Sequence, residues 1–245
     1  MKITRISINN FRLLENIELC LEDCATVIVG RNNSGKTSLT EFFRRLLDEK
    51  APRFKLEDFS LGIHEKFRDA YQLYRSSADE NIVRAALPVI SSTMTIKYSE
   101  SEALGPLSDF VIDLNEHCNI AQINVQYALA AGKISQFFAD LNDDVVAFFK
   151  ALKERIPLLF EIMTEAHDPN DPANIKLLEV ANLRAVIQIG FINAQRTLDD
   201  ASNKEKAILG KVFEKLFTAA ASAATNTDER VIATSLVNGK IKSPT

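Results

Sequence analysis

Residues 30–37 have the residue types and spacing of a phosphate-binding loop. They read Gly-Arg-Asn-Asn-Ser-Gly-Lys-Thr and match G-x-x-x-x-G-K-[ST] at every fixed position. Gly30 and Gly35 let the backbone turn sharply and approach phosphate where a Cβ would clash. The loop N–H groups then form an anion-binding nest. Lys36 adds a mobile charge for the β- and γ-phosphates, and the Thr37 hydroxyl is the usual protein ligand of Mg²⁺.

The segments on either side of the loop supply the context that this motif requires. Residues 25–29 are short, apolar and β-branched, which predicts a buried strand that runs into Gly30. The apolar residues after Lys36 recur at the spacing of one helix face: Leu39, Phe42, Phe43, Leu46 and Leu47. Strand, loop and helix in this order place a helix N-terminus beneath the phosphates. The alternative is a glycine-rich turn with a chance lysine.

The predicted nucleotide-binding residues in this stretch are Gly30, Arg31, Asn32, Asn33, Ser34, Gly35, Lys36, Thr37 and Ser38.

Composition is that of a globular protein without a membrane span. The chain has 245 residues, 46% hydrophobic and 25% charged, with a net charge of −4. A negative total disfavours a surface that binds nucleic acid everywhere, although local basic patches remain compatible with it. No run of about 18 apolar residues occurs, and the N-terminus lacks the apolar core of a signal peptide. We therefore expect a cytoplasmic protein that does not contact membranes.

The cysteines do not predict a disulfide framework or a metal centre. There are three of them, Cys20, Cys24 and Cys118, an odd and small number for this length. Cys20 and Cys24 are spaced C-x₃-C, but no second Cys/His pair follows at zinc spacing. We expect these residues to be structural.

Two strands are predicted before the loop. Apolar and polar residues alternate over Ile3–Ile8 and again over Ile17–Leu21, which indicates two half-exposed strands. Two antiparallel strands ahead of the loop strand are not the beginning of a plain doubly wound fold.

These opening residues resemble those of a known group of ATPases. Three stretches are similar to the start of an ABC-type ATPase head of the RecF, SMC and OLD (overcoming lysogenization defect) group, usually labelled AAA family ATPases. They are Ile8-Asn9-Asn10-Phe11-Arg12, Ile17-Glu18-Leu19, and Val27 through Leu39. The resemblance implies an α/β P-loop NTPase fold with an antiparallel β-subdomain and a helical insertion, here over residues 133–172. It also implies ATP and Mg²⁺ as ligands. Arg12 matches an arginine that approaches the nucleotide in this group; the alternative is a solvated arginine at a strand end.

Further elements follow from periodicity. Glu65–Arg75 has helical spacing, and Thr93–Tyr98 and Ile123–Tyr127 alternate as strands. Residues 134–163 are predicted to be mostly helical, with a broad apolar stripe. Residues 110–113 are not interpreted as a Walker B strand, because no glutamate follows Asp113 directly and residues 104–114 have helical spacing.

A last strand is predicted at Val186–Ile192, followed by Asn193-Ala194-Gln195-Arg196. The resemblance implies that a glutamine in this region contacts Mg²⁺ or the attacking water, and Gln195 is the candidate. The alternative is a polar residue at a strand end. Arg196 is a candidate to face nucleotide or DNA. A long helix is predicted over residues 209–217.

Several motifs of a complete ABC-type head are absent from the sequence. No signature near Leu-Ser-Gly-Gly-Gln and no hydrophobic run that ends in Asp-Glu follow Gln195. We therefore expect residues 1–245 to be a single P-loop ATPase domain that forms the N-terminal portion of such a head.

The resemblance implies an ATP-binding head of an OLD/RecF-like ATPase, linked to DNA repair or anti-phage defence. Self-association or a partner head, and DNA in the full assembly, are the implied partners. The alternatives are a nucleotide-binding interaction module without hydrolysis and a different P-loop NTPase. A GTPase would need Asn-Lys-x-Asp, and residues 203–206 lack the aspartate.

Overall fold

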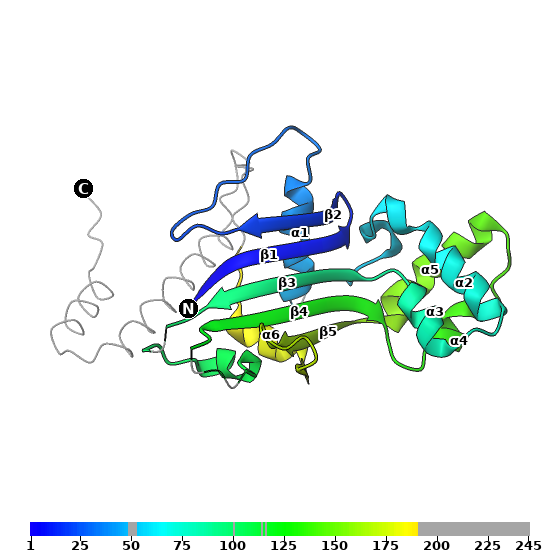
Figure 1. Ribbon diagram of the computed structural model, residues 1–245. Helices are drawn as coiled ribbons and strands as arrows, with labels where there is room; N and C mark the ends of the chain where they lie inside the picture. Colours follow the sequence, from blue (N-terminus) through cyan, green and yellow to red (C-terminus); the bar gives the residue numbers. More distant parts are fainter. Residues whose placement is uncertain (49–52, 100, 114, 116, 191–245) are drawn as a thin grey trace, which may run out of the picture. The chain divides into compact units, whose positions relative to one another are not determined.

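The computed structural model describes residues 1–48, 53–99, 101–113, 115 and 117–190. The chain divides into two compact units, 1–189 and 190–245, and the helices and strands of the described residues lie in the first. Its centre is a six-stranded sheet in the order β2-β1-β3-β4-β5-β6, in which every neighbouring pair is antiparallel (Figure 1). The strands are β1 (Lys2–Phe11), β2 (Leu14–Cys20), β3 (Ile90–Lys97), β4 (Ile120–Leu129), β5 (Phe160–His167) and β6 (Ile175–Leu178).

The helices cover one face and one end of this sheet. In the view of Figure 1, α1 lies behind the strands, and α2 to α5 gather beyond one end of them. The helices are α1 (Lys36–Leu47), α2 (Glu65–Arg75), α3 (Glu80–Ala86), α4 (Ile134–Phe138), α5 (Val145–Leu159) and α6 (Val180–Val186), with short 3₁₀ helices η1 (Leu56–Asp58), η2 (Leu61–Ile63) and η3 (Gly105–Phe110). The predicted strands β1 to β4 and the predicted helices α1 and α2 are confirmed.

Alternation of residue type explains why the sheet has one buried and one open face. In β3, Ile90, Met94 and Ile96 are buried, whereas the hydroxyl-bearing residues Ser91 and Thr93 between them are only partly buried. Because successive strand side chains point to opposite faces, the apolar set packs against α1 and its neighbours.

Aromatic rings form the continuous part of the core. Phe42 on α1 packs edge-on against Phe11 of β1, with ring centroids 5.3 Å apart. Phe54 contacts both of these rings and also Tyr127 of β4, and Tyr127 lies 5.5 Å from Phe160 of β5. Offset and edge-on ring pairs of this kind add to the free energy of apolar burial. They fix the helix that follows the loop against the sheet.

The strand predicted at residues 25–29 does not form, and this prediction is wrong. The segment has no regular structure, and Val27 and Val29 are 81% and 85% exposed. A strand requires a neighbour whose backbone completes its hydrogen bonds. Within the described ranges no strand pairs with this segment, and the sheet ends at β2. The β-branched composition therefore indicates a segment that could join a sheet, but it does not show that a partner strand is present.

Three other expectations need correction. The helical prediction for residues 134–163 holds only to Leu159, because β5 begins at Phe160. The predicted strand at 186–192 is wrong over its described part: α6 ends at Val186, and residues 187–190 have no regular structure. Residues 104–114 contain the 3₁₀ helix η3 rather than an α-helix, and Asp113 lies beyond its end. The long helix predicted over residues 209–217 lies outside the described residues.

Candidate nucleotide-binding site

The backbone of the phosphate loop turns at two residues with positive φ. Asn33 has φ 63°, and Gly35, the residue before α1, has φ 88°. A Cβ on Gly35 would lie 2.9 Å from Leu14 Cδ2, at the start of β2, and 3.7 Å from Leu13 Cβ, on the turn between β1 and β2. Glycine at this position therefore satisfies both the left-handed conformation and the close approach of the hairpin.

Lys36 closes the loop on itself. Its Nζ donates to the carbonyl oxygens of Gly30 (2.7 Å) and Arg31 (2.6 Å) and to Ser34 Oγ (3.2 Å). A Cβ on Gly30 would lie 2.5 Å from Ser34 Oγ, so the Ser34 hydroxyl would have to rotate away from its present position beside Lys36 Nζ. The ammonium group is thus held over the loop by neutral acceptors, which an anionic phosphate oxygen can replace with a stronger, charge-assisted bond.

The first turn of α1 is suited to an anion. No side chain caps it, and it contains no acidic residue. Its first N–H groups lack partners within the helix and carry the positive end of the helix dipole. Thr37 is exposed beside them, whereas Ser38 is buried. These residues fit ATP with Mg²⁺: amides and Lys36 for phosphate oxygens, and the Thr37 hydroxyl for the metal ion.

Arg12 lies on the two-residue turn between β1 and β2, next to the residues that touch Gly35. Its Nε and Nη2 donate to Asp58 Oδ1 at 2.9 and 2.8 Å, and Nη2 lies 4.0 Å from Glu41 Oε1. The structure thus brings Arg12 to the same hairpin turn as the loop contact. Its approach to nucleotide stays a prediction. Gln195 and Arg196 lie outside the described residues.

Two carboxylates that sequence reasoning did not single out organise this region. Asp58 accepts from Arg12 and from Arg45 Nη1 (3.1 Å), and Glu41 on α1 accepts from Arg45 Nε (2.7 Å) and Arg44 Nε (2.8 Å). Hydrogen bonds from Arg44, together with the charge and hydrogen bond of Arg45, lower the pKa of Glu41 to about 2. In the sequence, Asp58 is marked only by its position between the apolar residues Leu56 and Phe59.

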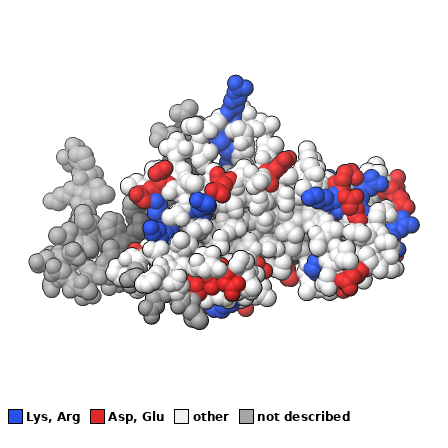
Figure 2. Space-filling view, in the orientation of Figure 1, with Lys and Arg blue, Asp and Glu red and all other residues white. Residues whose placement is uncertain are grey.

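Basic side chains on α1 and α5, which could contact DNA phosphates, are paired with carboxylates of the protein. Arg44 and Arg45 bind Glu41, and Lys153 Nζ lies 2.8 Å from Glu57 Oε1. Figure 2 shows the open face of the sheet, where uncharged residues predominate between scattered acidic and basic side chains. No extended basic surface is present on that face in the described part of the chain.

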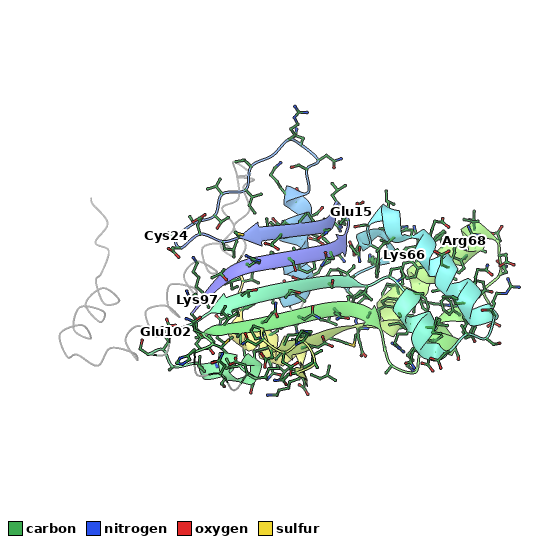
Figure 3. The ribbon with its side chains drawn as sticks, in the orientation of Figure 1. Glu15, Cys24, Lys66, Arg68, Lys97 and Glu102 are labelled. Carbon is green, nitrogen blue, oxygen red and sulfur yellow. The ribbon has the colours of Figure 1, made fainter. Side chains whose placement is uncertain are left out.

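The exposed cysteines and the main cavity are separate from the phosphate loop. Cys20 and Cys24 are exposed free thiols, and Cys24 lies on the connection after β2, at the end of the sheet where Lys97 and Glu102 are also found (Figure 3). The described residues contain no group of three or more His, Cys, Asp or Glu side chains that could hold a metal ion. A cavity of about 380 Å³ at the other end of α1, lined by Arg45, Tyr127 and Leu159 among others, includes no loop residue.

A comparison with protein families decides the classification. A family model described as AAA ATPase domain matches residues 1–242, nearly the whole chain. The chain belongs to this AAA ATPase domain family. ATP-dependent nucleotide chemistry is the family's general function, and ATP with Mg²⁺ its general ligand. The mixed α/β structure of this AAA ATPase domain agrees with the P-loop NTPase fold predicted from its sequence.

A search of curated proteins found no match to this chain. Among its described residues, no helix combines the length and the apolar character needed to cross a membrane.

Proposed function

We propose that this AAA ATPase domain binds ATP with Mg²⁺ through residues 30–38 and works as an ATP-driven head of the OLD/RecF-like type. The observation that carries the proposal is the loop itself. Gly35 turns it in a left-handed conformation, Lys36 Nζ is held over it by carbonyl oxygens, and α1 begins directly beneath it without a side-chain cap. This arrangement offers amide donors and one mobile cation to a polyphosphate.

Each loop residue has a role in the proposal. Lys36 exchanges the carbonyls of Gly30 and Arg31 for β- and γ-phosphate oxygens, and the loop amides bind the same group. Thr37 holds Mg²⁺, which in turn neutralises charge on the phosphates when it is bound. Arg12 and Gln195 are proposed as further contacts, to phosphate and to Mg²⁺ or water respectively.

Calorimetric titration with MgATP tests the site. Lys36→Ala removes a charge-assisted phosphate contact, so the dissociation constant should rise more than about tenfold. The matched control is Lys66→Ala, which removes an exposed lysine on α2, away from the loop (Figure 3). Unchanged affinity in Lys36→Ala, or an equal loss in both variants, would refute the assignment.

A second candidate function is nucleotide binding without turnover. It is favoured by one sequence observation, the absence after Gln195 of a hydrophobic run ending in Asp-Glu. Phosphoryl transfer needs a positioned water and charge stabilisation beyond the loop. We expect residues 1–245 alone to bind MgATP but to release phosphate only slowly. Robust steady-state turnover that Lys36→Ala abolishes would favour the catalytic head instead.

The cellular role that we propose follows from the resemblance to OLD/RecF-like heads. A head of this type would work in the cytoplasm, in DNA repair or anti-phage defence, and would pair with a second copy or a partner head around ATP. DNA would then be held by the assembly, because the basic clusters of a single head are engaged by Glu41 and Glu57.

A further inference from the structure

Asp58 is unusual among the charged residues of this domain. It is the only charged residue classed as buried in the described part of the chain, with 2% of its surface exposed. Burial of a carboxylate is costly unless charged partners and hydrogen bonds compensate. Asp58 has both: Oδ1 accepts from Arg12, and Oδ2 accepts from Arg45 Nη1 and from the backbone N–H of Lys55 (2.8 Å).

Arg12 is held by Asp58 through backbone and side chain together. The Arg12 backbone N–H donates to Asp58 O at 2.8 Å, and Arg12 has a positive φ of 48°, which is uncommon for a residue with a Cβ. Ser60 N–H donates to Asn10 O (3.0 Å), and Phe11 and Phe59 form an isolated antiparallel bridge. A strained backbone of this kind persists when its surroundings over-determine it, and such residues cluster at ligand sites.

The guanidinium of Arg12 has one unused nitrogen. Nε and Nη2 both point to Asp58 Oδ1, and Nη2 also faces Glu41. Nη1 has no hydrogen-bond or ion-pair partner among the described residues, and the side chain is 33% exposed. The Arg12 guanidinium is therefore held by Asp58 on one edge, and its Nη1 edge is available to bind a ligand.

The same cluster is connected to the phosphate loop on two sides. Leu13 and Leu14, which follow Arg12, form the wall against Gly35. Glu41 and Arg45 lie on α1, whose first turn forms the floor of the loop, and Arg45 also binds Asp58. A change of charge at Asp58 thus reaches the β1–β2 turn and α1 through direct contacts.

We propose that Asp58, assisted by Glu41, is a positioning residue that holds the Arg12 guanidinium so that its free edge meets a phosphate group of the bound nucleotide. The inference rests on the proposed function, since it requires a nucleotide at the loop. Its new element is the role of Asp58. An arginine whose fork is already fixed loses little conformational freedom when it binds phosphate, whereas an unrestrained arginine must be ordered at that moment.

The test is a double-mutant cycle on MgATP affinity at a temperature where all variants are folded. Arg12→Ala should weaken binding by about 10- to 100-fold, the range for a hydrogen bond between charged groups. Asp58→Asn, which keeps shape but removes charge, should weaken it by about three- to tenfold, the cost of ordering one long side chain. Because Asp58 acts through Arg12, the double variant should be no worse than Arg12→Ala alone.

The matched control is Glu57→Gln. Glu57 precedes Asp58 and pairs with Lys153, but both side chains are more than half exposed. Its substitution should leave MgATP affinity unchanged. Losses that add in the double variant, or an Asp58→Asn affinity equal to that of the unmodified chain, would overturn the proposal and leave Asp58 a purely structural residue.

Arg12→Lys keeps the proposal falsifiable if Asp58→Asn fails to fold. A lysine retains the charge but cannot donate to Asp58 through two nitrogens of a planar fork. We expect its affinity loss to lie within about threefold of that of Arg12→Ala, and full retention of affinity would overturn the positioning role. Failure of the unmodified chain to bind MgATP, or of Lys36→Ala to weaken it, would instead contradict the proposed function, so the two failures are distinguishable.

Discussion

Substitution of Gly35 by alanine should reduce both stability and nucleotide affinity. The left-handed conformation, at φ 88°, costs a residue with a Cβ about 1–2 kcal/mol. Alanine recovers about 0.4–1 kcal/mol by restricting the unfolded chain. The new Cβ would also lie 2.9 Å from Leu14 Cδ2, and moving that methyl group off its rotamer costs about 1 kcal/mol. We therefore expect a net destabilisation of about 1–2.5 kcal/mol, measured by urea unfolding.

Gly132→Ala is the matched control for this prediction. Gly132 also has a positive φ, of 68°, but a Cβ there would meet no atom within 4 Å. Its substitution should cost only the backbone contribution, about 0–1.5 kcal/mol, and therefore about 1 kcal/mol less than Gly35→Ala. It lies on the turn before α4, so MgATP affinity should not change. Gly35→Ala should lose more than about tenfold in affinity, because alanine disfavours the left-handed turn that leads the loop into the first turn of α1. Equal stability losses and equal affinities in the two variants would refute this reasoning.

Three further predictions concern ionisation, the core and DNA. The folded-state pKa of Glu41, about 2, lies below its ordinary value of 4.5. The ionised Glu41 side chain therefore stabilises the folded state fully above pH 4.5, and this stabilisation is lost as pH falls toward 2. Because water reaches this carboxylate, we expect the stabilisation to be about 1 kcal/mol. In a series of urea unfolding measurements at different pH, Glu41→Gln should abolish this part of the pH dependence. Tyr127→Phe should lower the free energy of unfolding by about 1 kcal/mol, because its buried hydroxyl donates to Phe54 O (3.0 Å) and Ile156 O (3.1 Å). An unchanged urea midpoint would contradict this. Residues 1–245 should bind duplex DNA only at about 10⁻⁴–10⁻⁶ M and weaken steeply with salt, so nanomolar anisotropy titrations at physiological salt would reveal a dedicated DNA site.

Elements whose pattern is local were predictable from the sequence. The helix at Glu65–Arg75 agrees at both ends, because Phe67, Ala70 and Tyr71 provide a complete buried face. Alternation within β3 and β4 was sufficient for the same reason, since each strand separates apolar from polar residues along its own length. The sharp turn at Gly35 and the helix that follows it were predictable because the motif specifies backbone conformation and not only composition.

Features that depend on partners distant in the chain were not predictable. Residues 25–29 are apolar and β-branched, yet their backbone finds no neighbouring strand among the described residues. β5 was missed because the apolar stripe of α5 continues through Pro157 into Phe160 without a change of composition. The burial of Asp58 was not predictable, because it depends on Arg12 and Arg45, which approach it from two other segments.

The most direct test of the nucleotide site is an amide NMR spectrum of residues 1–245 recorded with increasing MgATP. The largest chemical-shift changes should fall on the amides of residues 31–38, with smaller changes at Leu13 and Leu14, which contact Gly35. Lys36→Ala should suppress these changes at the same ligand concentration. Shifts concentrated elsewhere in the domain, or a loop whose amides do not respond to saturating MgATP, would contradict the account.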